Sequence, residues 1–418
     1  MSLRSRLRSL GPCLVTGASD DDPSGIATYS QAGAQFGFGL LWCALLTYPL
    51  MAAVQEICDR TALATKKSLG ELAREQFGPV WRGIIWLLVL ILVAANTMNI
   101  AADLVAIAAG VNLLGGGPIW IWALGSGLGI LILVVSGNYP IVSKVFKYLC
   151  LALLSYLAVI FFINVRWREV AIHAVVPHIE FTKEYLALLI AVLGTTISPY
   201  LFFWQSAYRV EEMEHEDIPA LNDEGVDLAA AEEKSTRFDV FFGMGFSNLV
   251  MFAVVLATAS AFLGKNVTIN SAADAARALQ PVAGGYAKIL FALGFIGSGI
   301  LAVPVLAGAG AAATAGLAGK KYGFAERAKN APLFYTMVAL GMSIGTGLTL
   351  LHTNPIRLLI LVAELNGVAA VPFLVLVMVI SSNRRVMGDY TNKKVAITLG
   401  WLTVTIMTVA SIGLFMTI

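Results

Sequence analysis

The sequence predicts an all-α integral membrane protein, and three observations support this prediction. Hydrophobic residues make up 58% of the chain and charged residues only 13%, whereas an average soluble domain is about a quarter charged. Apolar runs of about 20 residues, long enough to cross a bilayer, recur from end to end. Two of these runs are interrupted by polar residues and a proline, at Asp22-Pro23-Ser24-Gly25 and at Thr195-Thr196-Ile197-Ser198-Pro199.

Hydropathy divides the chain into about eleven membrane spans. We expect them at residues 11–36, 40–58, 83–111, 119–135, 142–163, 186–208, 238–263, 287–317, 333–351, 356–380 and 395–417. A cytoplasmic N-terminus places about three quarters of the 28 Lys and Arg residues on the cytoplasmic side, as the positive-inside rule requires. The expected protein is therefore a multi-pass protein of the cytoplasmic membrane, surrounded by the lipid bilayer.

The loops are expected to be short, with one exception, so residues 1–418 should form a single transmembrane domain. The exception is residues 210–235, which are rich in Glu and Asp and which we interpret as a solvated connector. The net charge of +2 gives no indication of a nucleic-acid partner. The four scattered cysteines are expected to be small buried side chains. The sequence does not define an oligomeric state, and a monomer is compatible with it.

The first interrupted span carries three consecutive aspartates, Asp20, Asp21 and Asp22, directly before Pro23. A carboxylate inside the hydrocarbon costs several kcal/mol on insertion scales, at about 2.5–3.5 kcal/mol, so such residues usually face a cavity or a partner. Proline removes a backbone donor and breaks the helix, and the carbonyls that it frees cannot face lipid. The negative charge at this break predicts a cationic ligand.

The sixth span repeats this pattern with a polar, proline-broken middle. Spans one to five and six to ten then form two five-helix repeats, at about residues 11–165 and 186–382, with an extra helix at 395–417. An odd number of spans per repeat inverts the second relative to the first, as in transporters that bind substrate between discontinuous helices. The alternative for either break alone is a kinked helix packed by small residues, without a ligand.

The residues around the first break resemble the Nramp family of divalent-metal transporters, which have the LeuT-type fold. The resemblance is most specific over the first two spans. It is carried by Gly11-Pro12, Asp22-Pro23-Ser24-Gly25, Gln31-Ala32-Gly33-Ala34, Phe36-Gly37, Leu40-Leu41-Trp42, Gln55 and the stretch 64–75. It implies a transporter rather than an enzyme, with no cofactor and a divalent metal ion as its substrate.

The family's metal site differs from this chain at several positions. The metal-binding aspartate of the family falls on Asp22, but its asparagine falls on Gly25 and its methionine on Ser198. The two histidines of its sixth span fall on Tyr200 and Gln205. A thioether favours softer transition metals, while carboxylate, hydroxyl, carbonyl and water favour Mg²⁺. The pattern is similar to that of the prokaryotic Nramp-related magnesium transporters, so we expect Mg²⁺ transport, with Mn²⁺ also accepted.

The resemblance also implies roles for backbone groups and for a proton route. Carbonyls around Ser19 and Thr195 are expected to help hold the ion or its waters, and Gly25 and Ser198 to leave room for those waters. Family members carry an Asp-x-x-Glu pair in the third span. Here Asp103 is present but Ala106 replaces the glutamate, so Asp103 is either a structural acid or a remnant of that route. We expect a uniporter that works by alternating access.

Other polar residues remain open to two interpretations. Gln55 is expected close to the ion site, and Glu364 is either vestibule lining or structurally paired. Glu56 and Asp59 are each either solvated or paired with Arg60. Two further transport classes remain as alternatives. One is a proton-coupled Mn²⁺/Fe²⁺ symporter of the ordinary Nramp type, and the other is a sodium-coupled carrier of organic solutes. No motif of a known catalytic centre occurs in the sequence.

Overall fold

The computed structural model describes residues 12–135, 153–160, 165–222, 229–262, 268–269, 271, 274–275, 287–351 and 354–417. Regular structure in these ranges is entirely helical, which confirms the predicted all-α class. Seven of the described helices are long and apolar enough to cross a membrane, or eight if the bent pair of residues 23–40 and 42–65 is one span. The fifth expected span, 142–163, lies mostly outside the described residues.

The remaining expected spans each coincide with a helix or a broken pair of helices. The first is the pair α2 and α3, and the sixth is the pair α11 and α12. The bounds are α2 Pro12–Asp20, α3 Pro23–Phe36, α4 Trp42–Thr65, α6 Pro79–Leu113, α7 Ile119–Val135, α11 Lys183–Thr196, α12 Pro199–His215, α13 Ala229–Phe262, α15 Ala287–Leu317, α16 Pro332–Leu348, α17 Pro355–Ser381 and α19 Lys394–Thr417. Shorter helices include α5 Leu69–Gln76, α9 Leu154–Val159, α10 Trp167–Val175 and α18 Arg384–Met387, with 3₁₀ turns at Gly37–Leu40, Thr349–Leu351 and Gly388–Tyr390.

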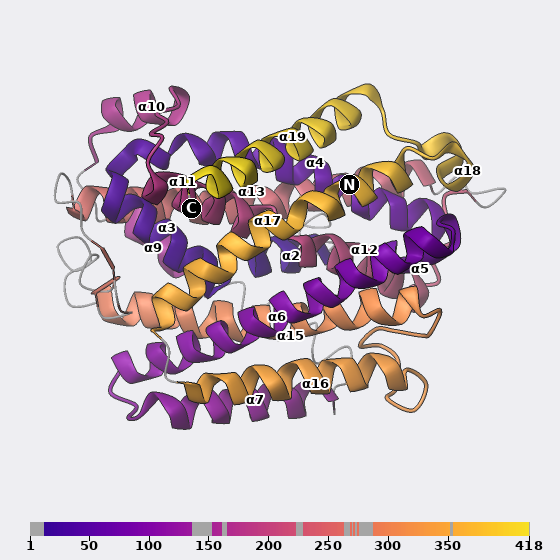
Figure 1. Cartoon of the computed structure of the whole chain (residues 1–418), viewed down its shortest axis with the longest axis horizontal. Coiled ribbons are helices and arrows are strands. Elements are labelled where there is room, and N and C mark those ends of the chain that lie inside the picture. The colour runs from indigo at the N-terminus through magenta and orange to yellow at the C-terminus, as the bar shows by residue number, and fades with distance from the viewer. Residues whose placement is uncertain are drawn as a thin grey trace.

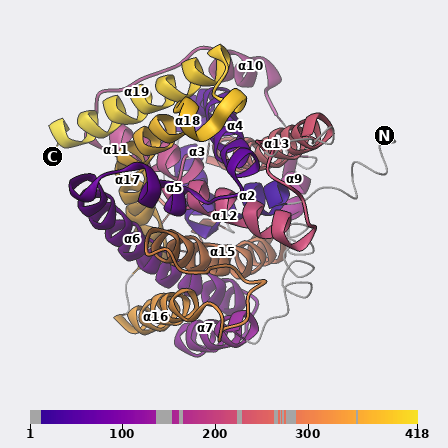
Figure 2. The same cartoon turned by 90° about the vertical axis from the view of Figure 1, so that its right-hand side faces the viewer.

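The long helices form two packed groups. In the four-helix group, α6, α7, α15 and α16 contact one another, and in the broken-helix group, α2, α3, α4, α11, α12 and α13 do so. Figure 1 shows the four-helix group as the lower layer, and the view turned by 90° in Figure 2 shows the same separation. Helix α17 packs against both groups, and α2, α3 and α12 contact helices of the four-helix group. The two breaks therefore lie where the groups meet.

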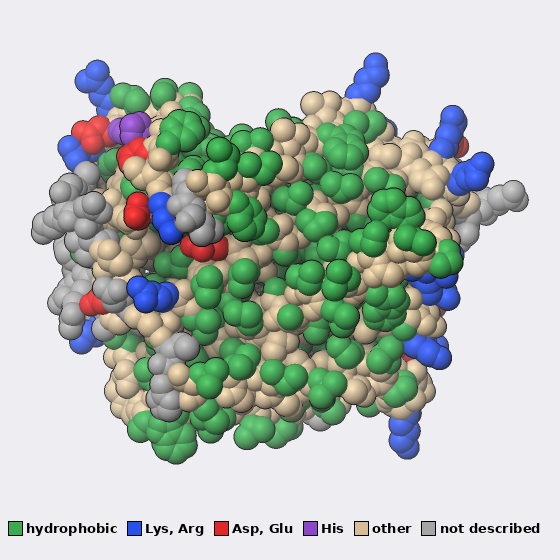
Figure 3. Space-filling view, in the orientation of Figure 1, with side chains coloured by type: hydrophobic (Ala, Val, Ile, Leu, Met, Phe, Trp, Pro, Cys, Tyr) green, Lys and Arg blue, Asp and Glu red, His purple; other side chains and the backbone are tan. Residues whose placement is uncertain are grey.

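The surface is consistent with a protein that crosses a bilayer. Hydrophobic side chains cover the middle of the face drawn in Figure 3, while Lys and Arg side chains gather toward its left and right ends. The long helices run between those ends in the same orientation (Figure 1). Large apolar side chains such as Trp81 and Leu87 of α6 and Phe415 of α19 are more than half exposed. Lipid is the solvent that such a surface requires.

At both breaks, the residues that follow are typical of a helix N-terminus. Pro23 and Pro199 occupy the first turn of α3 and α12, where the missing backbone N–H costs nothing and φ is already helical. The residues before them, Asp22 and Ser198, have extended backbone angles. Because a proline disfavours helical geometry in the preceding residue, the chain must leave the helix at both places. The predicted breaks are confirmed.

A glycine allows the second break to approach α17. A Cβ built on Gly194 would lie 2.2 Å from the carbonyl oxygen of Ala363 and 2.4 Å from the backbone nitrogen of Gly367. Only glycine permits this contact, which fixes the end of α11 against α17.

The acidic connector differs from the expectation. Helix α12 continues to His215 and α13 begins at Ala229, so helical residues occupy much of the range 210–235. Val210 and Glu211 are buried, and the Glu211 carboxylate accepts a hydrogen bond from the backbone N–H of Ala325. The expectation of a solvated connector is therefore wrong for its first part. The charged residues at the end of α12 remain helical, and Glu211 and Glu212 have partners within the protein, the Ala325 N–H and Arg209.

Candidate metal site

At the first break, the Asp22 side chain caps the N-terminus of α3. Its Oδ1 accepts hydrogen bonds from the Ser24 hydroxyl at 2.6 Å and from the backbone N–H of Gly25 at 2.8 Å. This is an N-cap for α3, which satisfies a backbone donor that the helix cannot use. The cap also fixes the direction of the carboxylate. Asp22 is 1% exposed, so its charge is held in the interior.

The other oxygen of Asp22 is bound by α6, across the boundary between the groups. Asn99 Nδ2 lies 2.8 Å from Asp22 Oδ2 and 2.9 Å from Asp103 Oδ2, and its amide donates to both carboxylates. Oδ1 of Asn99 and Oδ1 of Asp103 have no hydrogen-bond partner within the described residues. Both side chains are fully buried. Two carboxylates and an amide carbonyl are oxygen ligands suited to a small hard cation.

The second break comes close to the first. The hydroxyl oxygen of Thr195 lies 3.0 Å from the position that a Cβ on Gly25 would take. The Tyr200 hydroxyl donates to the carbonyl oxygen of Ser19 at 2.9 Å. Ser198 donates its hydroxyl to the Gly194 carbonyl oxygen at 2.6 Å, within its own helix turn. The structure thus brings Gly25 and Ser19 of the first break close to Thr195 and Tyr200 of the second, while the hydrogen bonds of Ser198 stay within its own helix turn.

One expectation at this site is wrong in the observed conformation. We expected Gly25 to leave room for water, but a Cβ there would also meet the Asp20 carbonyl oxygen and the Tyr29 ring, each at 3.3 Å. The space is filled from three helices, by Asp20 of α2, Tyr29 of α3 and Thr195 of α11. Gly25 contributes its backbone N–H to Asp22 rather than an open volume.

The three consecutive aspartates do not share one set of hydrogen-bond partners. Asp20 accepts a hydrogen bond from Ser247 of α13 at 2.7 Å, on a different element from the α6 residues that contact Asp22. Asp21 accepts none within the described residues. No cluster of three or more His, Cys, Asp or Glu side chains that could hold a metal ion occurs in that part of the chain. The side chains that meet at Asp22 therefore come from two groups of helices rather than from one acidic run.

A second polar network ties α2 and α12 to α4. Thr16 donates to Gln205 at 2.6 Å, Gln205 donates to Asp59 Oδ1 at 2.6 Å, and Arg209 Nε donates to the same oxygen at 2.7 Å. Asp59 is fully buried. The expectation that Asp59 is solvated or paired with Arg60 is therefore wrong, because Asp59 forms its ion pair with Arg209 of α12. Arg60 pairs with Glu56 at 3.2 Å, which confirms the expected pairing for that carboxylate.

Sequence reasoning alone does not identify several of these residues. Asn99, Ser247 and Arg209 were not proposed as site residues. Asn99 and Asp103 have the four-residue spacing that places two side chains on one face of a helix, and this signal could have identified Asn99. Gln55 is buried and its Oε1 has no partner within the described residues, but no hydrogen bond given by the structure links it to Asp22.

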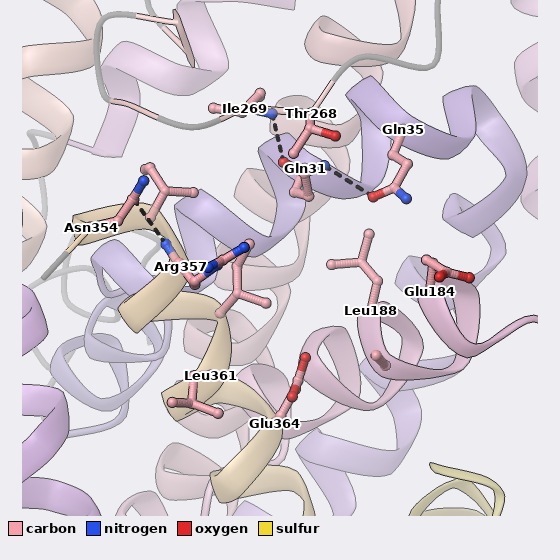
Figure 4. Close-up of a pocket in the computed structure, with 13 residues that line it drawn as sticks. Gln31, Gln35, Glu184, Leu188, Thr268, Ile269, Asn354, Arg357, Leu361 and Glu364 are labelled. Atoms are coloured by element: carbon pink, nitrogen blue, oxygen red, sulfur yellow. Dashed lines mark hydrogen bonds between the residues drawn. The ribbon is translucent and has the colours of Figure 1, made fainter. Parts of the chain in front are cut away.

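Glu364 lies apart from the two breaks, at a pocket of about 410 Å³. Figure 4 shows this pocket between α3, α11 and α17, with Gln31, Glu184 and Arg357 around it and Glu364 at its lower side. Gln31 is held by two hydrogen bonds, accepting from the Ile269 N–H and donating to Gln35. Asp22 is not among the residues that line the pocket. The candidate site around Asp22, which is 1% exposed, is therefore separate from this pocket and buried.

These features define the class of protein. Two apolar spans are each interrupted at a proline, and buried carboxylate, amide and hydroxyl oxygens lie at the breaks, on the boundary between two groups of helices. This is the architecture of transporters with discontinuous helices. The helical fold, with its apolar surface, makes the chain a multi-pass membrane protein.

Comparison with known proteins agrees with this class. The profile of the family described as "Natural resistance-associated macrophage protein-like" (Nramp) matches residues 13–417. The divalent metal cation transporter MntH of Acidiphilium cryptum is 28% identical over 392 residues, covering 92% of this chain and 84% of that protein. MntH of Deinococcus radiodurans is 26% identical over 415 residues, covering 96% and 87%.

Solved structures share the fold. The Eremococcus coleocola manganese transporter, in complex with an aromatic bis-isothiourea substituted compound, superposes with a TM-score of 0.76 at 16% identity, over 99% of this chain and 87% of that one. Mhp1, a nucleobase-cation-symport-1 family transporter, gives a TM-score of 0.60 at 14% identity, over 98% and 91%. The chain belongs to the Nramp family. This confirms the predicted family and fold, and the protein is a transporter rather than an enzyme.

Proposed function

We propose that this protein transports Mg²⁺ into the cytoplasm, with Mn²⁺ also accepted, and that it belongs to the magnesium-transporting branch of its family. Divalent-metal transport is the function named for its relatives. The preference for Mg²⁺ is supported by one observation above all. Residues 19–25 and 194–200, which form both breaks, contain no methionine, cysteine or histidine.

The atoms available to bind a metal explain why the lack of methionine, cysteine and histidine matters. Asp22, Asn99 and Asp103 offer carboxylate and amide oxygens, and Thr195 offers a hydroxyl close by. A site without sulfur or imidazole loses the main chemical basis for selecting softer transition metals. Mg²⁺ usually binds through one or two carboxylates and keeps several waters. The arrangement therefore favours a hard ion over a soft one.

We further propose that transport is not coupled to protons. Ala106 stands on α6 where the family carries a glutamate, and the sixth span has Tyr200 and Gln205 in place of two histidines. Histidine is the side chain that ordinarily titrates near neutral pH. Tyr200 donates to a backbone carbonyl and Gln205 to Asp59, so both have hydrogen-bonding roles without exchanging protons.

The driving force would then be the membrane potential. We place the N-terminus in the cytoplasm on the distribution of Lys and Arg. An inside-negative potential supplies about 2.3 kcal/mol per charge per 100 mV, so about twice that amount acts on a divalent cation. This suffices for net entry of Mg²⁺ without a second ion.

The main rival is a proton-coupled Mn²⁺ transporter, which the names of the relatives favour. Asp103 would be the carboxylate through which such coupling could act. A sodium-coupled carrier of organic solutes is the other alternative. The likeness to Mhp1 extends only to the fold.

Purified protein in liposomes tests the proposal. Entry of Mg²⁺ is followed with a lumenal indicator while Mn²⁺, Ca²⁺ and Zn²⁺ compete, and lumenal pH is recorded in the same vesicles. We expect saturable Mg²⁺ entry, competition by Mn²⁺ and no lumenal acidification. Metal-dependent proton entry would support the proton-coupled rival, and transport of Zn²⁺ without Mg²⁺ would contradict the proposed substrate.

A further inference from the structure

Glu364 is a carboxyl group within a membrane-spanning helix, and the described part of the chain gives it no partner. It lies about two and a half turns after Pro355, the first residue of α17. Its side chain is partly exposed, and within the described residues no hydrogen bond or ion pair engages it. An ionisable group inside a span is costly, and such residues usually serve a function. The Glu364 carboxyl group is therefore available to a ligand from outside the chain.

Two cavities adjoin at Glu364. The first is the polar pocket of about 410 Å³ between α3, α11 and α17. The second is a groove of about 840 Å³ between α6, α17 and α19. Leu361 and Glu364 line both. Figure 4 shows Arg357 and Glu364 on the same helix at this pocket, with Glu184 across it on α11. A ligand at Glu364 therefore has access to a polar space and to an apolar one.

The groove is a surface for lipid. Among the described residues that line it, Glu364 is the only charged one. Its other lining residues include Ile91 of α6, Leu365 of α17 and Phe415 of α19, which are all exposed. In a bilayer, an apolar groove that opens on the outer surface of the helices is filled by acyl chains.

The polar pocket carries charges of both signs. Arg357 and Glu184 are exposed, and within the described residues neither side chain forms an ion pair. An arginine guanidinium matches the geometry of a phosphate group, and a carboxylate accepts hydrogen bonds from a primary ammonium. Arg357 precedes Glu364 by seven residues, which is about two turns of the same helix. The long arginine side chain shortens that separation, so both groups suit one zwitterionic headgroup.

We propose that this site binds an aminophospholipid, with phosphatidylethanolamine as its simplest form. The phosphate would contact Arg357, the ammonium would contact Glu364, and one acyl chain would lie in the groove. On the orientation that the Lys and Arg residues predict, this end of α17 faces outward, so the lipid belongs to the outer leaflet. The proposal is independent of the transported ion, because Asp22 lines neither cavity.

Lipid selection by the purified full-length protein tests this proposal. The protein in detergent is mixed with equal amounts of phosphatidylethanolamine, phosphatidylcholine and phosphatidylglycerol of identical acyl chains. Excess lipid is removed, and the retained lipids are quantified by mass spectrometry. Choline has no N–H to donate and phosphatidylglycerol has no ammonium. We therefore expect the wild type to prefer phosphatidylethanolamine over both by about tenfold, the scale of one charge-assisted hydrogen bond.

Glu364→Gln should reduce that preference to nearly equal retention, because glutamine has the shape of the neutral acid but not its negative charge. The matched control is Glu169→Gln, which should behave as the wild type. Glu169 is an exposed carboxylate of α10 that pairs with Arg166 at 2.9 Å, and it lines neither cavity. An unchanged preference in Glu364→Gln would overturn the assignment of the ammonium to this carboxylate.

Two further variants test the other ends of the lipid. Arg357→Gln should lower retention of all three lipids, since each carries a phosphate. Ala369→Trp places a large side chain in the groove, which Ala369 lines, and should also lower retention of all three. Full retention by Ala369→Trp would overturn the placement of the acyl chain. Equal retention of the three lipids by the wild type would overturn the whole proposal, and that comparison requires no variant to fold.

Discussion

Under the proposed function, Ser198 is the residue at which the choice between hard and soft metals is tested most directly. The family carries methionine at this position, and here the hydroxyl donates to the Gly194 carbonyl within the break. The Ser198 hydroxyl is therefore used in a hydrogen bond to the backbone, and Ser198 has no sulfur atom that could serve as a soft metal ligand. A thioether at the same place would offer the soft ligand that the rest of the pocket lacks.

We expect Ser198→Met to shift competition toward softer ions. The concentration of Zn²⁺ or Mn²⁺ that halves Mg²⁺ entry should fall by about tenfold, the scale on which ligand changes alter metal affinity. Ser198→Ala is the matched control, because it removes the hydroxyl without adding sulfur, and its selectivity should resemble the wild type. Equal inhibition profiles in the two variants would refute the argument from ligand softness.

The sequence identified Asp22 because an aspartate followed by proline inside an apolar span has few structural explanations. It did not identify Asn99, because α6 carries three asparagines and long-range packing decides which of them meets Asp22, although the four-residue spacing to Asp103 favours Asn99. Gly25 shows a different limit. The absence of a side chain suggested open space, but Tyr29 of the same helix and Thr195 of α11 both lie against that position, and the approach of α11 is not specified by local sequence.

The half-helices are the elements on which movement would depend. The breaks at Pro23 and Pro199 followed from backbone chemistry and could be predicted. The partners of each half-helix could not, because they depend on long-range packing. Asp59 was assigned to Arg60, its chain neighbour, whereas the structure pairs it with Arg209 of α12 and through Gln205 with Thr16 of α2. This network holds α2 and α12 to α4.

We expect Asp59→Asn to destabilise the closed arrangement of these elements. Removing one partner of a buried ion pair typically costs about 3–5 kcal/mol, although Arg209 retains Glu212. The midpoint of thermal unfolding in detergent should fall clearly. Glu75→Gln is the control, because Glu75 pairs with Lys67 on the surface, where such a pair contributes about 0–1 kcal/mol. Equal midpoints for both variants would show that the buried network is not structurally important.

At the scale of the whole molecule, the candidate ion site lies on the boundary between the broken-helix group and the four-helix group. Asp22, Asn99 and Asp103 are at most 1% exposed, so the conformation described is closed at the site. Relative movement of the two groups would separate Asp22 from Asn99 and expose the ion, which is the geometry that alternating access requires. The predicted inverted repeats, at residues 11–165 and 186–382, remain a prediction that fits this arrangement.

The most direct test of the account is the initial rate of Mg²⁺ entry into liposomes containing wild-type protein or Asp22→Asn, measured side by side at a fixed inside-negative potential. Asparagine keeps the shape of the side chain and removes its charge. We expect saturable entry with the wild type and a rate indistinguishable from that of empty liposomes with the variant. Equal rates for the two proteins would contradict the assignment of the ion site to the helix breaks.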